Sequence, residues 1–453
     1  MFRYAWRRPC HLASRSRIGP LRIPLRYIVY LLPAAFLVGT NVKVSDAADR
    51  PIYIGASELV ITSGVFSLIL VRLMRNRRVW VPRSVGFWVV AFSAVVLLSN
   101  PVNVVFGRWN TVSVGAIVEV LRWFEYVAVL PIISGLITRP RQFRPILLVA
   151  FVCLMAHAAV TLYQAATFDF SQARPYGLVR SASDVEGLSV SNPNTAGTLL
   201  MIGSLYLLAF VLEERHVFGK VALIGALLAS LGAMLFTLSR SSVLGFGVGA
   251  LTMPFIFRRT LGSRLKAATV VGLAVLVGLY FVVTAESLSA RVANSLNLTS
   301  SSTEALSILE RLSNWRTTLQ GWNDYFLLGI GFGRFRELFD FMTPDNLYLE
   351  LFATTGVVGL VAFLGMILAL GRSAMQLESF SVLVAPLKAG YLASLSGLIV
   401  VSVTGGVLLA PRVSGLFWLL SGIMIKLSEW QQADAEMGAV TLEPVRPLRT
   451  FTK

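Results

Sequence analysis

The chain has 453 residues, a formal net charge of +17 and a mean hydropathy of +0.71. Apolar residues make up 55% of it and charged residues only 14%, which excludes an ordinary soluble globular protein. The positive charge does not indicate nucleic-acid binding. It gathers in the N-terminal tail and in alternate connections between apolar segments, as it does in membrane proteins. We therefore expect no nucleic acid among the partners.

Apolar segments of about 20 residues recur along the chain, and each is long enough to cross a bilayer. They do not alternate apolar and polar residues, so they predict helices rather than barrel strands. The sequence thus predicts an all-α, polytopic membrane protein with about 12 transmembrane helices. The predicted transmembrane helices lie roughly at 27–42, 52–71, 85–106, 111–137, 145–166, 193–212, 218–238, 242–257, 267–285, 346–370, 386–404 and 412–428. The first and the eighth are short.

The distribution of lysine and arginine predicts the orientation of these segments. A basic tail, residues 1–26, precedes the first segment, and every second connection after it is also rich in arginine. The positive-inside rule then places both termini in the cytoplasm. The predicted order is helices 1–9 within 27–285, a long periplasmic loop at 286–345, helices 10–12 within 346–428, and a cytoplasmic tail at 429–453.

The long loop contains the pattern of an amphipathic helix. Its apolar residues recur at alternating four- and three-residue spacing, at Ile308, Leu312, Trp315, Leu319, Trp322 and Phe326. Two placements fit this stripe. The helix lies in the membrane interface with its tryptophans at headgroup level, or it packs on the protein itself.

Three arginines are candidates for binding an anion. Arg240 lies on a very short turn between the seventh and eighth segments, where its planar guanidinium suits a diphosphate. The alternative is an interfacial arginine that reaches lipid phosphate. Arg311 and Arg316 flank Trp315 on the amphipathic helix and would extend the same site, unless they belong to a solvated face.

Asp345 stands directly before the tenth segment, in the run TPDNLYLELF. A carboxylate at the mouth of a membrane cavity is a candidate general base. Helix capping is the competing role, because an acidic residue before a helix suits both the free amides and the dipole.

Other charged residues point to structure rather than chemistry. Glu119, Arg122 and Glu125 share one face of the fourth segment and are expected to form ion pairs inside the bundle. The three histidines are scattered, and no Asp-x-Asp signature is present. We therefore expect no bound metal and no cofactor.

Several runs, in this order, resemble the superfamily of O-antigen ligases and Wzy-type O-antigen and exopolysaccharide polymerases. They are SNPNTAGTLL, LSRSSVLGFGVG, RLSNWRTTLQGWNDYFLLGIGFGRF, DNLYLELFATTGVVGLVAFL and the pattern TGG…PR…LFWLLSGIM. The resemblance covers about residues 180–425. It implies a GT-C-like membrane glycosyltransferase that takes a glycan from undecaprenyl diphosphate at the periplasmic face of the bacterial inner membrane.

The resemblance also implies roles for individual residues. Arg240 and Arg311 would bind the diphosphate with Arg316 beside them, and would act in catalysis together with Asp345. Contacts with the glycan are expected from Asn194, Arg180 and Asn346. The expected partners are the carrier-linked glycan, an acceptor glycan or lipid, membrane lipid and a chain-length regulator.

One departure bears on the branch of the superfamily. Ligases carry a histidine directly before the Asn-x-Tyr-Leu element, and this chain has Asp345 there. This favours a polymerase over a ligase that transfers glycan to lipid A–core or another acceptor. A transporter of lipid-linked sugars is an alternative of another class. Transporters often show internal repeats, and no long repeat is visible here.

Overall fold

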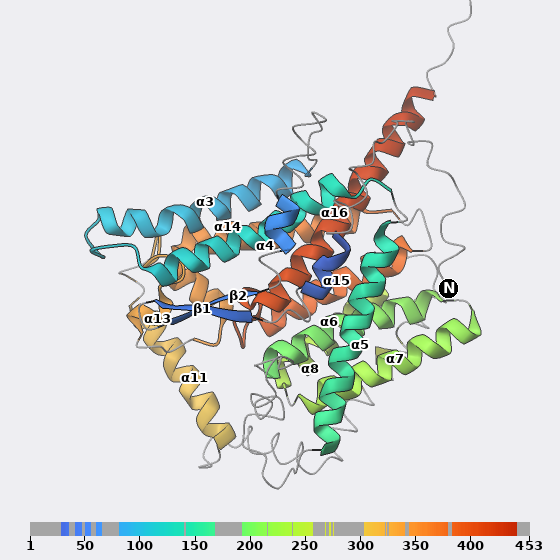
Figure 1. Ribbon diagram of the computed structural model, residues 1–453, viewed down its shortest axis with the longest axis horizontal. Helices are drawn as coiled ribbons and strands as arrows, with labels where there is room; N and C mark the ends of the chain where they lie inside the picture. Colours follow the sequence, from blue (N-terminus) through green and yellow to red (C-terminus); the bar gives the residue numbers. More distant parts are fainter. Residues whose placement is uncertain are drawn as a thin grey trace, which may run out of the picture.

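The computed structural model describes residues 29–35, 41–47, 50–55, 60–65, 81–139, 142–167, 193–214, 216–237, 239–256, 303–321, 326–339, 344–378 and 383–441, with the single positions 268, 271, 272, 275 and 323. This part of the chain is largely helical (Figure 1). Its elements are β1 (Asn41–Ala47), β2 (Arg50–Gly55), α3 (Arg83–Val105), α4 (Val114–Leu136), α5 (Phe143–Thr167), α6 (Pro193–Glu213), α7 (Val217–Phe236), α8 (Arg240–Ile256), α11 (Thr303–Gln320), α13 (Phe335–Leu338), α14 (Leu347–Gln376), α15 (Val384–Val401), η4 (Val407–Leu409) and α16 (Pro411–Thr441).

Six of the described helices are long and apolar enough to cross a membrane, namely α3, α5, α6, α7, α14 and α15. Most predicted segments from the third onward coincide with a helix to within a few residues. The eighth was expected to be short, and α8 has 17 residues. The predicted ninth segment, 267–285, lies almost entirely outside the described residues. The prediction of twelve spans therefore stays a prediction.

Two local expectations differ from the structure. The strands β1 and β2 form an antiparallel hairpin where the ends of the first two apolar segments were expected. The reason lies in the sequence: Val42 and Val44, then Ile52 and Ile54, occupy alternate positions, which is the period of a strand. At the other end of the chain, α16 continues to Thr441, so the first part of the expected C-terminal tail is helical.

The inner helices of the bundle pack closely through small residues. Most of α6 and α15 is buried, whereas α5 and α7 are largely exposed. At the contact between α8 and α15, a Cβ added to Gly249 would lie 2.6 Å from the carbonyl oxygen of Ala393. The glycines of α8 thus let two backbones approach, a common device between membrane helices. Elsewhere α14 lies along α3, and α16 packs on α4 through Trp123 and Trp418.

Helix α14 is broken at Gly356, where φ is 67° and ψ is −173°. A segment of the chain beside the break supplies hydrogen-bond partners, since the amide of Val357 donates to the carbonyl oxygen of Phe326 at 2.7 Å. A Cβ at Gly356 would lie 2.1 Å from the carbonyl oxygen of Leu327. Both the positive φ and this close approach require glycine.

The same segment also donates hydrogen bonds to the carbonyl oxygens that precede the break. The amides of Ile330 and Gly331 donate to the carbonyl oxygens of Ala353 and Thr354 at 2.9 and 3.0 Å. The segment therefore replaces the hydrogen bonds that the interrupted helix loses. Non-helical backbone at membrane depth is tolerated where protein covers it in this way. The break fixes the first half of α14, residues 347–355, against the chain that precedes it.

Candidate functional site

An ion pair joins α11 to the residues that precede α14. The Nε of Arg311 lies 3.2 Å from the Oδ2 of Asp345, although 34 residues separate them in sequence. Beside it, the indole Nε1 of Trp315 donates to the carbonyl oxygen of Pro344. Both charged side chains are partly exposed, at 27% for Arg311 and 44% for Asp345. The pair is thus fixed by the protein and still open to a ligand.

The backbone at Asp345 is unusual. Its φ is +46°, and no other non-glycine residue in the described ranges has a positive φ. Aspartate tolerates this left-handed conformation better than most residues do, although it still costs energy. The N-cap of α14 is the next residue, Asn346, whose Oδ1 accepts from the amides of Tyr348 and Leu349. The capping role proposed for Asp345 therefore falls to Asn346, which is itself buried.

More charged groups gather around the start of α14. Glu350 lies close enough to Glu119, Arg336 and Asp345 for these groups to act on it electrostatically. On α4, Arg122 donates from one guanidinium nitrogen to Glu119 at 2.8 Å, which confirms the ion pair expected from their spacing. Helices α4, α11, α13 and α14 thus all contribute charged residues to one region. Such a cluster suits a charged substrate. Its ion pairs neutralise the charges of the side chains when no substrate is present.

A second polar corner lies where α6 and α8 begin. The hydroxyl of Ser239 donates to Oδ1 of Asn194 at 3.0 Å and lies 2.8 Å from the hydroxyl of Ser242. Thr198 extends this group of hydroxyls within α6. Arg240 directly follows Ser239, is exposed and is the first residue of α8. Two residues expected to bind substrate, Arg240 and Asn194, therefore belong to the same corner.

Helix α11 turns a polar face towards the protein and an apolar face outwards. Arg311 is partly buried and Thr318, seven residues later, is only 1% exposed. Leu312 and Leu319 are 46% and 50% exposed. The helical period places Arg316 on this outward apolar face, away from Arg311. The packing of the leucines onto the protein is therefore not observed, and α11 projects from the bundle in Figure 1.

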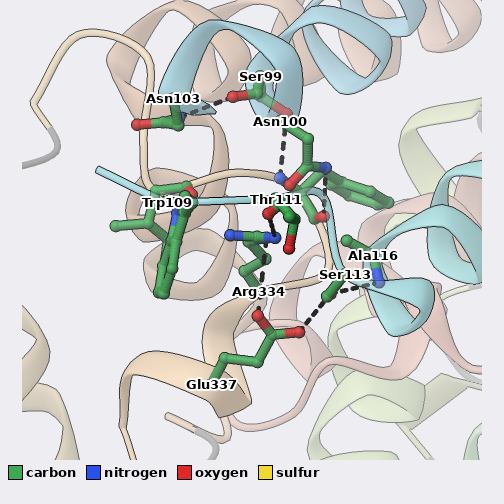
Figure 2. A network of polar contacts seen from close by, with 11 residues as sticks. Ser99, Asn100, Asn103, Trp109, Thr111, Ser113, Ala116, Arg334 and Glu337 are labelled. Carbon is green, nitrogen blue, oxygen red and sulfur yellow. Dashed lines mark hydrogen bonds and ion pairs between the residues drawn. The ribbon is translucent and has the colours of Figure 1, made fainter. Parts of the chain in front are cut away.

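The run GIGFG forms a tight turn, as its glycines predict. Gly329, Gly331 and Gly333 all have positive φ. Side chains from the end of α3 hold this turn. Asn103 donates to the carbonyl oxygen of Gly329 at 3.0 Å. Asn100 donates to that of Phe332 at 2.9 Å (Figure 2). Sequence reasoning missed this contact. The available signal was the polar cluster Ser-Asn-Pro-Val-Asn inside an apolar segment.

The expected site residues thus fall into groups. Arg311, Asp345 and Asn346 meet at α11 and α14, whereas Arg240 and Asn194 meet at α6 and α8. Arg180 lies outside the described residues. Within the described residues, no three His, Cys, Asp or Glu side chains are grouped so that they could hold a metal ion.

Comparison with known families supplies the remaining observation. Residues 224–364 match the family model described as O-antigen ligase. This region, residues 224–364, is therefore similar to the O-antigen ligase family, and it is called the O-antigen ligase domain below. The domain runs from within α7 into the second half of α14, so it includes Arg240, Arg311 and Asp345. The match confirms the resemblance inferred from the sequence. No match was found among curated proteins.

The O-antigen ligase domain and the six apolar helices together indicate an integral membrane protein. Members of the matched family are glycosyltransferase-like enzymes that act on a lipid-linked glycan and an acceptor. Both the Arg311–Asp345 pair and Glu350 lie within the matched region, whereas Glu119, which acts electrostatically on Glu350, comes from α4 outside it. The charged region described above therefore combines residues of the O-antigen ligase domain with residues that precede it.

Proposed function

We propose that the protein polymerises oligosaccharide repeat units carried on undecaprenyl diphosphate, at the periplasmic face of the bacterial inner membrane. The observation that carries the proposal is the Arg311–Asp345 pair inside the O-antigen ligase domain. A cation suited to a diphosphate and a carboxylate suited to accept a proton stand side by side. A sugar transfer from a diphosphate carrier needs both.

Donor binding would change the partner of Arg311. A diphosphate offers a guanidinium more charge and more acceptor oxygens than one carboxylate does. When Arg311 turns to the diphosphate, the Asp345 carboxylate is released to face the acceptor. The ion pair thus links arrival of the donor to exposure of the base.

The transfer itself is a single displacement. An acceptor hydroxyl oxygen attacks the anomeric carbon, the bond from that carbon to the diphosphate oxygen breaks, and the diphosphate leaves with the electron pair. Asp345 takes the hydroxyl proton. Arg311, with Arg240 as a second cation, stabilises the charge that grows on the leaving group. The product has an inverted anomeric centre.

The exposed face of α11 supports a placement of this site at the membrane surface. Outward leucines beside Arg316 fit the lipid interface, where the guanidinium reaches phosphate and the leucines reach hydrocarbon. In this arrangement α11 holds Arg311 at the depth at which a carrier lipid presents its diphosphate. Asn194, at the start of α6, is proposed to contact the glycan.

Two other functions are tested by the same experiment. A ligase would use the same chemistry with a different acceptor, and the aspartate at position 345 favours the polymerase. A lipid-linked sugar transporter is less consistent with the structure, because in transporters broken helices line the substrate path. Here the break in α14 is closed by backbone hydrogen bonds from residues 326–331.

The glycans that accumulate on the carrier when the gene is deleted distinguish these functions. A polymerase predicts carrier-linked single repeat units at the periplasmic face, and complementation with the full chain restores polymer. Full-length polymer on the carrier would instead show a ligase. Single units retained at the cytoplasmic face would show a transporter.

A further inference from the structure

Arg334 is a buried cation that the proposed reaction does not use. It precedes α13 and is only 2% exposed. Its guanidinium lies 4.4 Å from the ring centroid of Trp109, and one of its terminal nitrogens donates to the carbonyl oxygen of Thr111. Its Nε lies 3.6 Å from a carboxylate oxygen of Glu337. Burial lowers the pKa of Arg334 from its usual value, and Glu337 acts in the opposite direction.

The partners of Arg334 are themselves tied together (Figure 2). The indole of Trp109 donates to the carbonyl oxygen of Ile330 at 2.8 Å, and the hydroxyl of Ser113 donates to Glu337. The connection between α3 and α4 is therefore joined to residues 330–337 through the stacked Arg334 and through these two hydrogen bonds. We call this group, made of Trp109, Thr111, Arg334 and Glu337, the Arg334 clamp.

The clamp acts on a segment that is also docked into the break of α14. The segment from Phe326 to Gly331 exchanges backbone hydrogen bonds with both halves of the broken helix. On its other side, Asn103 of α3 donates to Gly329 of this segment, and Asn100 donates to Phe332, the residue directly after it. Residues 326–331 thus form a wedge between α3 and α14. The clamp lies at the end of this wedge, where the four-residue helix α13 begins.

Helix α13 links the clamp to the charged region at the start of α14. Arg336 lies within α13, two residues after Arg334, and is exposed. Arg336 and Asp345 both act electrostatically on Glu350. One arginine of this short run is therefore buried as an anchor, and the other is exposed and acts on the same carboxylate as the proposed proton acceptor does. A helix of one turn has little stability of its own, so its placement depends on the anchor.

We propose that Arg334 is a positioning residue that holds Arg336 at the substrate site, where Arg336 is a further cation for the diphosphate. This inference rests on the proposed function. Arg336 then joins Arg311 in stabilising the leaving group. Arg334 itself does not touch substrate, because its side chain is enclosed by the clamp.

Four variants of the full chain in nanodiscs test the inference: R334Q, R336Q, the double variant R334Q/R336Q and the control R108Q. Arg108 also donates to the turn, at 3.4 Å from the carbonyl oxygen of Gly329, but it is exposed. The first measurement is hydrogen–deuterium exchange of residues 326–337 and of the residues after Gly356. R334Q should raise exchange there, whereas R336Q and R108Q should leave it unchanged.

The second measurement is kcat/KM for transfer from a synthetic undecaprenyl-diphosphate-linked repeat unit. R334Q and R336Q should each lower it on the order of 100-fold, the cost of a misplaced site group, and R108Q should not. The double variant should be no slower than R334Q alone. R334K, which keeps the charge but not the planar fork, should recover less than half of the loss on a logarithmic scale.

The exchange measurement and the kinetic measurement can each contradict the inference independently. Unchanged exchange in R334Q would show that the clamp does not hold the wedge. Additive losses in the double variant would show that Arg334 does not act through Arg336. Absence of transfer by the wild-type chain would overturn the proposed function and this role of Arg336 with it, while the exchange arm would still decide whether the clamp holds the wedge.

Discussion

The guanidinium of Arg311 on α11 meets the carboxylate of Asp345 directly before α14, with 3.2 Å between Nε and Oδ2. The two residues lie in the region that is similar to the O-antigen ligase family and in no common helix. Their contact requires the chain between them to fold back, through the turn at GIGFG and the short helix α13. The position of the pair is therefore a property of the whole segment 303–350.

Replacing Arg311 with alanine should remove most of the transfer activity. The loss should be about 100- to 1,000-fold in kcat/KM, the usual effect of removing one donor to a developing negative charge. Lysine keeps the charge but not the fork, so R311K should lie between R311A and wild type. Because Arg311 is partly exposed, both variants should still insert into the membrane, which a fluorescence size-exclusion profile would check.

Asp345 can be tested without disturbing the helix cap, because Asn346 caps α14. Asparagine tolerates the positive φ at position 345, so D345N should preserve the backbone while removing the proton acceptor. We expect a loss of about 100-fold or more in D345N. D345H keeps a proton acceptor and should lose less. Full activity in D345N would mean that Asp345 serves only the structure.

The cap itself gives a separate prediction for stability. N346A should destabilise the protein by about 1 kcal/mol, because two amides lose their acceptor. N346D keeps an acceptor at the same place and should be close to wild type. A thermal unfolding midpoint measured in the same detergent for the three proteins would show this order. Equal midpoints would contradict the assignment of the cap.

Two glycines provide a matched test of the broken helix. G356A must force a Cβ against the carbonyl oxygen of Leu327 at a positive φ, so it should destabilise the protein by about 2 kcal/mol or more. G225A, within α7, meets nothing within 4 Å and should be neutral or stabilising by about 0.5–1 kcal/mol. A similar shift of the unfolding midpoint in both variants would contradict the proposed role of the break.

The outward face of α11 can be mapped with single labelled cysteines. A fluorophore at L312C or L319C should be quenched by brominated lipids, because both leucines are exposed on the apolar face. The control is E310C, which is exposed on a different face of the same helix. Equal quenching at all three positions would show that α11 does not lie in the interface.

Much of this architecture was accessible from the sequence because it depends on local patterns. The lengths of the apolar segments predicted most helices from α3 onward, and the spacing of Glu119 and Arg122 predicted their ion pair. The glycines of GIGFG are typical of a tight turn, and all three have positive φ. Each of these inferences uses residues that are neighbours in the chain or on one helical turn.

The remaining features depend on contacts between distant residues. Of the β1–β2 hairpin, only residues 41–42 and 52–55 were predicted to belong to apolar helices, and the residues between them were predicted to be a connection without a strand. The sequence suggested that Asp345 might cap α14, and only the backbone geometry shows that Asn346 does so. Residues 326–331 bind to parts of α14 that are more than 20 residues away in the chain. The Arg334 clamp joins residues that are more than 200 positions apart.

The most direct test uses the purified full chain in nanodiscs with undecaprenyl-diphosphate-linked repeat units as both donor and acceptor. The proposal predicts that wild type joins the units into longer carrier-linked chains and releases undecaprenyl diphosphate, and that R311A does neither at a detectable rate. R108Q serves as the control for loss of a positive charge. Joined units in R311A at the wild-type rate would contradict the central role of the Arg311–Asp345 pair.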